Sequence, residues 1–548
     1  MATPSTLSDS GAGVGAPTPV VARTSARWPA AVAGVLAGAL TIAVAELIAV
    51  LLVRSGRAGG TPSPVVAVGG AFVDRTPAWL KDFAVATFGT ADKAVLLSGI
   101  FVVLVVAAAA AGVLAARRRT LGLLVVAALG AIATAAVLSR PGAQPIDVLP
   151  TVAGALVGMR SLSALTTRLG EATLRGLAVD RRSFLQLAVG TGVTAAVGGG
   201  LSQLIGSSSR AATASRAAVA LPPAVADAGP LAAGQVAAQG AAGLASAAEL
   251  ADVPKLSPLI TPVADFYRID TALAVPQVAS GDWRLRIHGM VEREVEISFA
   301  ELLALPLVDR MVTLSCVSNE VGGDLVGNQV WRGHPLRDLL ATARPAADAD
   351  MVLSTSADGW TAGTPLDALT DPRRDALLAV GMDGQPLPLE HGFPVRMVVP
   401  GLYGYVSATK WVVDLEVTRF DRAEGYWTPR GWSARGPIKT QSRIDVPRDT
   451  DQVPAGRIAV AGVAWAPHRG ISAVEVRVDD GPWQAASLGA GGSRDTWRQW
   501  LWRWDAAPGA HVLQVRATDG AGDSQTPDLA EPAPDGATGW HTVEVTIT

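Results

Sequence analysis

The most reactive side chain in the sequence is the thiol of Cys316, which is the only cysteine among 548 residues. A lone thiol forms no internal disulfide, so it is either a buried small hydrophobic group, as free cysteines often are, or a ligand or nucleophile. Val312 and Leu314 alternate with Thr313 and Ser315 before it, which predicts a half-buried strand, and Asn, Glu and Gly residues then predict a loop. We therefore expect the sulfur at the lip of a strand, where a soft thiolate can meet a metal or a substrate.

The flanks of this cysteine carry a family resemblance. Leu314-Ser-Cys-Val-Ser-Asn319 is followed by Trp331-Arg-Gly-His-Pro-Leu336. A Cys-x-x-Asn turn ahead of a Trp-x-Gly-x-x-Leu element resembles the molybdenum-ligand segment of the sulfite oxidase family. The resemblance implies a molybdopterin cofactor whose metal is bound by Cys316, and two-electron oxygen-atom transfer on a small-molecule substrate.

The same resemblance implies the remaining cofactor contacts. The segment 265–277 is similar to the family's opening cofactor segment, 354–367 to the one that places an acidic or hydroxyl residue beside the cofactor, and 384–411 is the most specific match. Arginine offers a bidentate fork and lysine a point charge to a phosphate. The implied binding residues are Phe266, Tyr267, Arg268, Asp270, Cys316, Asp358, His391, Arg396, Ala408, Thr409 and Lys410.

Some of these positions have an ordinary structural alternative. Tyr267 would also suit an amphipathic strand with its hydroxyl in water. Asp358-Gly359 is a good turn dipeptide. His288 follows an alternating strand pattern, so we expect it to be structural rather than catalytic.

The chain departs from the resembled family at one tyrosine. Family sulfite oxidases carry a tyrosine beside the metal, between the Lys-Trp strand and the final domain. Here the only tyrosine of that stretch is Tyr426, which comes several residues early. Sulfite is therefore not established as the substrate, and a sulfoxide or nitrate type of reductase on the same fold is an alternative.

The first two fifths of the chain are unusually apolar. Hydrophobic residues make up 49% of the chain and the mean hydropathy is +0.32, which favours membrane spans. The five expected transmembrane spans are 28–53, 94–116, 121–138, 148–164 and 184–205. The net charge of −3 gives no reason to expect nucleic-acid binding.

Basic residues in short loops predict the orientation. Arg23 and Arg27, the cluster 117–119 and the arginines between 160 and 182 fall on one side when the N-terminus is cytoplasmic. Five spans then place everything after residue 206 outside. We expect a multi-pass protein of the cell membrane whose catalytic domain lies on the extracytoplasmic side.

The fold class that follows is a multi-domain chain: N-terminal all-α transmembrane helices, a central α+β sulfite oxidase-like molybdopterin domain, and a C-terminal immunoglobulin-like β-sandwich. Short alternating strands at 457–463, 473–478, 511–517 and 541–547 predict the sandwich, which resembles the family's dimerisation domain and implies a homodimer. The expected boundaries are a disordered N-terminus at 1–22, the membrane domain at 23–206, an Ala/Gly/Pro-rich linker at 207–258 that buries little, the molybdopterin domain at 259–450, and the C-terminal domain at 451–548.

Electron transfer has to involve a partner. No histidine precedes His288 and the chain has no Cys-x-x-Cys-His, so we expect no haem. We expect an external electron carrier or a quinone to exchange electrons with the molybdenum site. Two rival functions are a thiol hydrolase and a membrane-tethered, non-enzymatic adhesion module, and bound metal would distinguish the enzyme from both.

The segment Asp180-Arg-Arg-Ser-Phe-Leu185 before the fifth span resembles a twin-arginine export signal. A cofactor inserted in the cytoplasm requires a route for folded protein, so a reporter fused after residue 206 should be exported. Replacing Arg181 and Arg182 by lysine keeps the charge and should trap the reporter inside. Export that survives this double change would show that the pair acts only as a topology flank.

Overall fold

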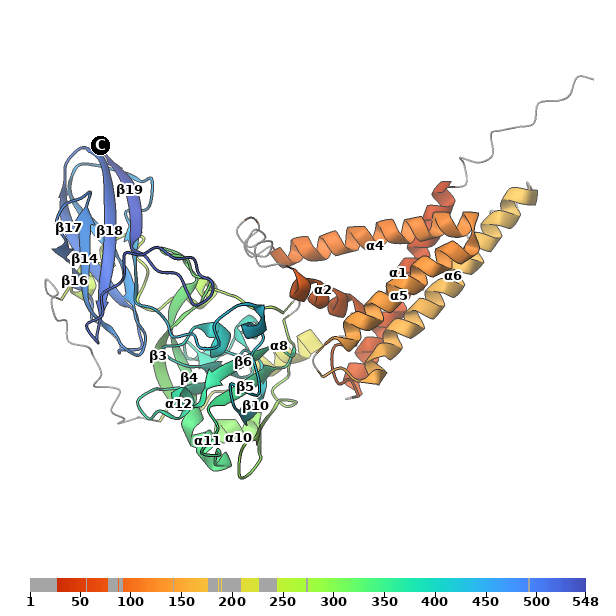
Figure 1. The fold of residues 1–548 in the computed structure, drawn as a ribbon, viewed down its shortest axis with the longest axis horizontal. Helices are drawn as coiled ribbons and strands as arrows, with labels where there is room; N and C mark the ends of the chain where they lie inside the picture. The colour runs from red at the N-terminus through yellow and green to blue at the C-terminus, as the bar shows by residue number, and fades with distance from the viewer. Residues whose placement is uncertain are drawn as a thin grey trace, which may run out of the picture. The chain divides into compact units, whose positions relative to one another are not determined.

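The computed structural model describes residues 27–55, 57–76, 92–140, 142–175, 208–225, 244–272, 275–490 and 493–548, with the single positions 87, 186 and 189. The chain divides into two compact units, 1–206 and 207–548. Figure 1 shows helices in the first unit and mainly strands in the second.

The first unit contains apolar helices. Its described helices are α1 (Arg27–Arg54), α2 (Pro64–Arg75), α4 (Asp92–Arg117), α5 (Arg119–Leu138), η3 (Pro145–Val148) and α6 (Leu149–Arg175). Four segments are long and apolar enough to cross a membrane, namely 27–53, 98–117, 119–138 and 145–169. They correspond to four of the five expected spans; the fifth, 184–205, and the Arg181-Arg182 pair lie outside the described residues.

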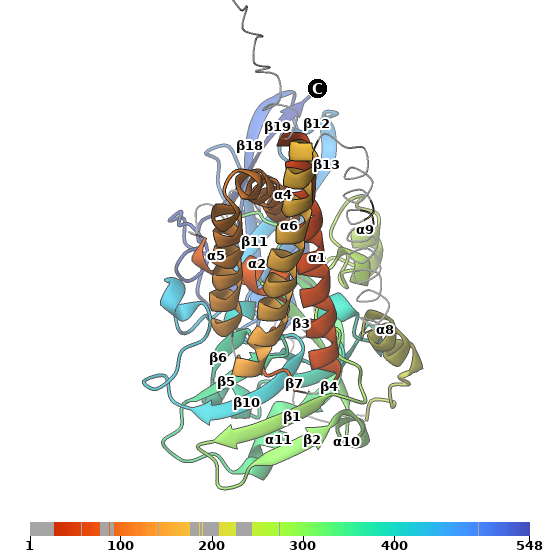
Figure 2. The ribbon, with the colours of Figure 1, turned by 90° about the vertical axis from the view of Figure 1, so that its right-hand side faces the viewer.

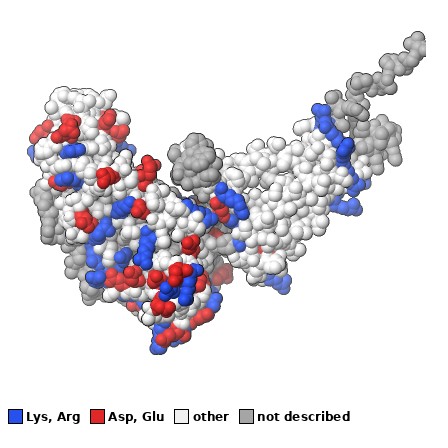
Figure 3. All heavy atoms as spheres, viewed as in Figure 1, with Lys and Arg blue, Asp and Glu red and all other residues white. Residues whose placement is uncertain are grey.

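Small residues let these helices approach closely, as in membrane bundles. A Cβ atom added to Gly34 of α1 would lie 2.0 Å from the carbonyl oxygen of Ala108 in α4. One added to Gly158 of α6 would lie 1.9 Å from the hydroxyl of Thr41 in α1. Figure 3 shows that the visible face of this unit carries few charged residues except near the ends of its helices.

Two sheets form the first part of the second unit. One has the strand order β2-β1-β10-β5-β6 and the other β3-β4-β7-β8, with β9 paired to β7. Figure 2 shows β2, β1, β10 and β5 side by side near α10 and α11. The elements are β1 (Arg284–Gly289), β2 (Val295–Ser298), α10 (Phe299–Ala304), β3 (Val308–Ser315), β4 (Val326–Pro335), α11 (Leu336–Ala343), β5 (Met351–Ser356), β6 (Thr361–Pro365), α12 (Leu366–Thr370), β7 (Leu377–Met382), β8 (Gln385–Pro386), β9 (Arg396–Val398) and β10 (Val412–Thr418).

Local sequence explains these elements. Leu285 and Ile287 of β1 are fully buried, while Arg284 and Arg286, which alternate with them, are exposed. The predicted helix after residue 298 is α10, whose N-cap Ser298 forms a capping box with Glu301. The apolar positions of α11 face a core shared with β1, β5 and β10.

The strand before Cys316 differs from the half-buried strand that its alternation predicts. Val312, Thr313, Leu314 and Ser315 are all buried, so both faces of β3 are covered at this end. The cover comes from the C-terminal region: the Trp497 amide donates to the Thr313 hydroxyl at 2.7 Å. Thr313 N–H in turn donates to the Asp495 carbonyl at 2.9 Å. The period-two pattern was therefore a correct indication of a strand and a wrong indication of exposure.

The C-terminal residues form two further sheets, ordered β11-β13-β17-β16 and β12-β19-β18-β14-β15. Val460 and Trp500 of the first share a buried cluster with Val474, Val515 and Val545 of the second. All four expected strands are confirmed. The elements are β11 (Gln441–Val446), β12 (Gln452–Val453), β13 (Gly456–Trp465), β14 (Ile471–Val478), β15 (Gln484–Ala485), β16 (Ser487–Leu488), β17 (Arg498–Ala506), β18 (Gly509–Asp519) and β19 (His541–Ile547).

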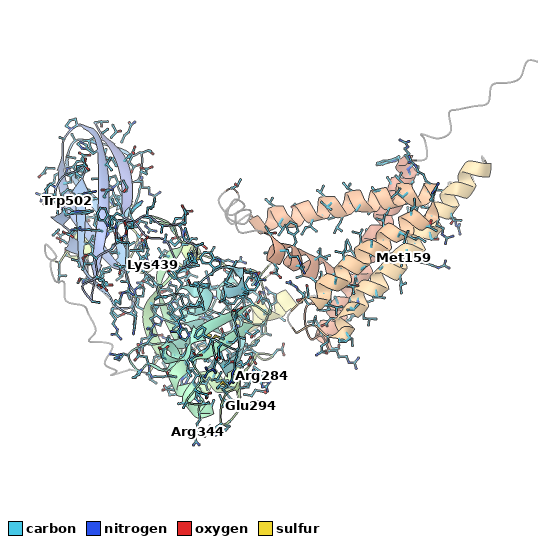
Figure 4. All side chains as sticks on the ribbon, in the orientation of Figure 1. Met159, Arg284, Glu294, Arg344, Lys439 and Trp502 are labelled. Carbon is cyan, nitrogen blue, oxygen red and sulfur yellow. The ribbon has the colours of Figure 1, made fainter. Side chains whose placement is uncertain are left out.

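The two pairs of sheets are joined by polar contacts. Lys439, labelled in Figure 4, donates from Nζ to Asp535 at 2.8 Å and to the Gly536 carbonyl at 2.7 Å. Trp497 donates from Nε1 to the Leu259 carbonyl at 2.8 Å. The bond from Trp497 to Leu259 connects residues far apart in sequence, and together with the bonds of Thr313 to Trp497 and Asp495 it fixes the β3 strand against the C-terminal sheets.

Described parts of the expected linker pack onto this unit. Helix α8 (Ser208–Ala218) is held by Arg216, which donates to the carbonyls of Leu387 and Pro386 at 2.8 and 2.9 Å. Before helix α9 (Ala247–Ala251), Ala245 N–H donates to the Leu488 carbonyl at 2.9 Å. These two segments contact the unit although most residues of 211–218 and 247–251 are exposed; 226–243 lies outside the described residues.

The free energy of unfolding should depend on the core that the β2-β1-β10-β5-β6 and β3-β4-β7-β8 sheets share. Leu378 of β7 is fully buried, so Leu378→Ala should lower the free energy of unfolding by about 2–5 kcal/mol through lost burial and a cavity. Leu529 is 79% exposed, and Leu529→Ala should change it by less than about 0.5 kcal/mol. Thermal unfolding of the detergent-solubilised protein, followed by tryptophan fluorescence, measures both, and equal midpoints would contradict this core assignment.

Candidate active site

One pocket in the second unit gathers most of the residues that the sequence singled out. Loops at strand ends form it: one follows β3, one follows β5, and one runs from β9 to β10. Nine of the eleven expected cofactor contacts line it, namely Phe266, Tyr267, Asp270, Cys316, Asp358, His391, Arg396, Ala408 and Lys410. The topology thus brings four separate sequence segments to one place.

Cys316 stands directly after β3, as expected, and is half-buried in the pocket wall. Its amide donates to the Leu325 carbonyl at 2.9 Å, and its carbonyl accepts from the Asn319 amide at 3.2 Å. The Asn319 side chain closes the loop by accepting from Leu325 N–H at 2.7 Å. Burial raises the pKa of the Cys316 thiol above its usual value of about 8.5. A nearby cation or metal is needed to hold this sulfur as thiolate.

A second group, which we call the cationic wall, consists of Arg268, Asp270, Arg396 and Lys410. Asp270 accepts from Lys410 Nζ at 2.7 Å and from Arg268 Nε at 3.1 Å, so two cations share its carboxylate. Desolvation lowers the pKa of Lys410 to about 8, although Asp270 opposes the shift. Three cations therefore stand against one carboxylate on this wall.

Arg396 has the most unusual environment of these cations. Its side chain is 5% exposed and donates hydrogen bonds to the carbonyls of His391, Met397 and Ala408, at 3.2, 3.4 and 3.5 Å. Its guanidinium lies 4.9 Å from the centre of the Trp331 ring. Burial lowers its pKa to about 10. No carboxylate bonds to it among the residues that the structure describes, so an anion entering the pocket would meet an uncompensated positive charge.

Aromatic rings and a neutral histidine support the cationic wall. The Phe266 ring stacks on Tyr267 with centroids 5.2 Å apart and meets Trp331 and His391 edge-on at 5.6 and 5.7 Å. Burial, aided by the nearby Arg396 and Lys410 charges, lowers the pKa of His391 to about 3. His391 is therefore neutral at physiological pH and can donate or accept a hydrogen bond without adding charge.

The expected contacts that do not line the pocket have other partners. The Thr409 side chain is fully buried and its hydroxyl meets the Ser354 hydroxyl at 2.7 Å. Arg268 does not line the pocket itself and donates to Asp270, which does. Tyr426 does not line the pocket, and the Arg430 guanidinium lies 3.7 Å from its ring centre. His288 is outside as well, 3.0 Å from Asp414 on the neighbouring strand.

The sequence did not predict eleven of the pocket residues, five of which are aromatic. Tyr405 lies in the motif that the sequence identified, and Trp427 and Trp432 lie in the stretch that departs from the family, but no role was assigned to any of them. The sequence signal for Trp427 and Trp432 is the density of aromatic residues after residue 424. The missed residues are Ile269, Thr271, Val317, Ser318, Ser356, Trp360, Gly404, Tyr405, Trp411, Trp427 and Trp432.

The pocket fits a molybdopterin. The surplus of positive charge on the cationic wall suits a phosphate-bearing ligand, and arginine and lysine are the usual phosphate donors. The Ser356 hydroxyl is buried in the lining and has no hydrogen-bond partner among the described residues, which is the mark of a group that bonds to a ligand. The described residues hold no cluster of three or more metal-binding side chains, so a metal in this pocket would need ligands from the cofactor as well.

Comparisons with known proteins agree with this fit. The family described as "Oxidoreductase molybdopterin binding domain" matches residues 272–427. Human mitochondrial sulfite oxidase is 28% identical over 310 residues, covering 48% of this chain and 54% of its own length. The protein named "Uncharacterized oxidoreductase YuiH" of Bacillus subtilis (strain 168) is 33% identical over 154 residues, covering 28% of this chain and 74% of its own. The solved sulfane dehydrogenase SoxCD of Paracoccus pantotrophus has a TM-score of 0.46 and 22% identity, over 54% of this chain and 84% of that one.

These features define a molybdenum cofactor-dependent oxidoreductase. The chain belongs to the sulfite oxidase-like family of molybdopterin-dependent oxidoreductases, and its cofactor is the molybdenum form of molybdopterin. The chain spans about half the length of the sulfite oxidases that it matches.

The neutral His391 makes stability depend on pH. Its folded pKa of about 3 lies below the unfolded value of about 6.5, so between these values the unfolded chain binds more protons. The contribution of His391 to the free energy of unfolding should be fully present above pH 6.5. It should fall by up to about 1.4 kcal/mol per pH unit as the pH drops toward 3. Chemical denaturation at pH 7, 6 and 5 should show a smaller loss for His391→Gln than for the unchanged protein.

His511, whose pKa is raised in the folded protein where that of His391 is lowered, supplies the control. The hydrogen bond that His511 donates to Asp479 raises the pKa of His511, so His511 stabilises the folded state below its unfolded pKa. Substituting glutamine there should steepen the acid loss. Identical pH profiles for His391→Gln and the unchanged protein would contradict the neutral assignment.

Proposed function

We propose that Cys316 ligates molybdenum and that the chain catalyses two-electron oxygen-atom transfer on a small molecule. The observation that carries the proposal is that the only thiol of the chain lines the same pocket as a wall with three cations and one carboxylate. When bound, the cofactor supplies the metal that exchanges an oxygen atom and two electrons with the substrate. The protein binds the cofactor, orients it and encloses the reacting groups.

Each side chain of the pocket has a proposed task within that scheme. Arg396 and Lys410 bind the anionic part of the cofactor, and Asp270 keeps the lysine ammonium in place through the 2.7 Å bond. His391, Tyr267 and Ser356 supply neutral polar groups around it. Asp358 and Ala408 contribute the remaining walls, while Thr409 positions the loop by bonding to Ser354.

The apolar helices of the first unit support a membrane anchor, because four of them are long enough to span the hydrocarbon core. We propose a multi-pass protein with the catalytic unit outside the cytoplasm, exported as a folded domain. The basic clusters described above support that orientation.

The C-terminal sheets support an immunoglobulin-like dimerisation domain. Their two sheets share one buried cluster, as a sandwich requires. A soluble carrier or a membrane quinone is proposed as the electron partner, since no haem motif occurs in the sequence.

Replacing the thiol tests the metal ligand. Cys316→Ser should keep the fold and much of the pterin but abolish turnover with an artificial electron dye, because a hydroxyl is a poor substitute for a soft thiolate. Molybdenum by mass spectrometry, pterin by fluorescence and circular dichroism separate loss of activity from loss of cofactor or fold. Thr409→Ser, which keeps the hydroxyl that meets Ser354, is the matched control. Full activity in Cys316→Ser would refute the ligand assignment.

A further inference from the structure

The turn that carries Cys316 also carries hydrogen-bond donors for its sulfur. Residues 316–319 form a tight turn in which the Asn319 amide donates to the Cys316 carbonyl at 3.2 Å. In turns of this kind a side-chain acceptor on the first residue can receive a hydrogen bond from the amide two positions on, as aspartate and asparagine do. Here the first side chain is the thiol and the residue two positions on is Ser318, and both line the pocket.

Three donors of this turn meet the sulfur. They are the amide of Val317 and the amide and hydroxyl of Ser318. A sulfur that carries negative charge, as a metal-bound thiolate does, is a stronger acceptor than a neutral thiol. Of the three donors only the Ser318 hydroxyl belongs to a side chain, so it is the one that a substitution removes without changing the backbone.

The C-terminal sheets hold the loop that follows this turn. Arg443 of β11 donates from Nη1 to the Gly323 carbonyl at 2.7 Å and is itself bound to Asp445 at 2.7 Å. A Cβ atom added to Gly322 would lie 2.2 Å from the ring of His541, the first residue of β19. The loop therefore lies directly against the C-terminal sheets, which restricts the directions in which the turn presents its donors.

The serine on the other side of the cysteine has a different role. The hydroxyl of Ser315 is buried at the end of β3 and donates to the Cys316 carbonyl at 3.2 Å. Ser318 is exposed, and serine is common in turns for its own backbone contacts. What distinguishes Ser318 from an ordinary turn serine is that its hydroxyl meets the only thiol of the chain.

We propose that Ser318 is a positioning residue that raises the reduction potential of the molybdenum centre through its hydroxyl hydrogen bond to the Cys316 sulfur. The inference rests on the proposed function, in which this sulfur is a ligand of the metal. A hydrogen bond withdraws electron density from a thiolate, so the thiolate donates less to the metal and the reduced metal becomes more favourable. The turn thereby makes the site a better electron acceptor.

A redox titration of the detergent-solubilised holoenzyme tests this directly. Ser318→Ala should favour the oxidised metal about fivefold per electron, which lowers the potential by about 40 mV, because one hydrogen bond to the ligand is lost. The one-electron-reduced metal is followed by electron paramagnetic resonance. The absorption band in which the sulfur transfers charge to the metal should also move to longer wavelength, and Ser318→Thr, which keeps the hydroxyl, should restore both values.

The neighbouring serine supplies the matched control. Ser315→Ala removes a hydroxyl that is equally close to the ligand along the chain but bonds to its carbonyl, so the potential and the band should stay unchanged. Equal potentials in Ser318→Ala and the unchanged protein would overturn the inference. An equal shift in both serine variants would overturn it as well, because the effect would then not depend on a bond to sulfur.

X-ray absorption at the molybdenum edge separates this inference from the proposed function. Ser318→Ala should keep the full number of sulfur neighbours, whereas Cys316→Ser should lose one. If Cys316→Ser loses none, the proposed function fails and the inference with it. If Cys316→Ser loses one and the potential of Ser318→Ala is unchanged, only the inference fails. Loss of molybdenum from Ser318→Ala would show that the hydroxyl holds the cofactor instead of adjusting its potential, which also overturns the inference.

Discussion

The pocket is organised around positive charge that the protein does not fully neutralise. Asp270 is shared between Arg268 and Lys410, and the buried Arg396 donates its hydrogen bonds to carbonyls beside the Trp331 ring. A buried cation is costly unless an anion accompanies it. The fold therefore maintains an arrangement that becomes favourable when an anionic cofactor enters, and the lowered pKa of Lys410 reports the same cost.

Rigid elements hold this arrangement in place. Cys316 and Lys410 stand on loops at strand ends, Arg396 begins β9, and β3 is fixed by the bonds of Thr313 to Trp497 and Asp495 of the C-terminal region. The C-terminal sheets thus contribute to the geometry of the thiol although no residue of theirs lines the pocket. A substitution at Trp497 or Asp495 would therefore shift Cys316 through β3.

Much of the architecture could be predicted from the sequence, because hydrophobic periodicity and capping are local signals. The capping box at Ser298, the strand before Cys316 and the four C-terminal strands are examples. The burial of Thr313 could not be predicted in this way, since its cover comes from Trp497, far along the chain. The packing of Arg216 against the β7–β9 connection was missed for the same reason, because its partners are distant carbonyls.

The residues of the candidate site also differ in whether a local sequence motif identifies them. Residues that sit in motifs, such as His391 and Lys410, were named from the sequence and lie in one pocket. Ser356 and Trp360 were missed, because a serine at a strand end and a tryptophan after a turn look like ordinary structural residues until the chain is folded. Thr409 was named from the motif, and its hydroxyl turned out to face Ser354.

The central claim is that Cys316 is a ligand of molybdenum in this pocket. X-ray absorption at the molybdenum edge counts the sulfur atoms bound to the metal, so it tests that claim without depending on a substrate. The account predicts that Cys316→Ser loses one sulfur neighbour of the metal relative to the unchanged protein while both retain the cofactor. The same number of sulfur neighbours in the two proteins would contradict it.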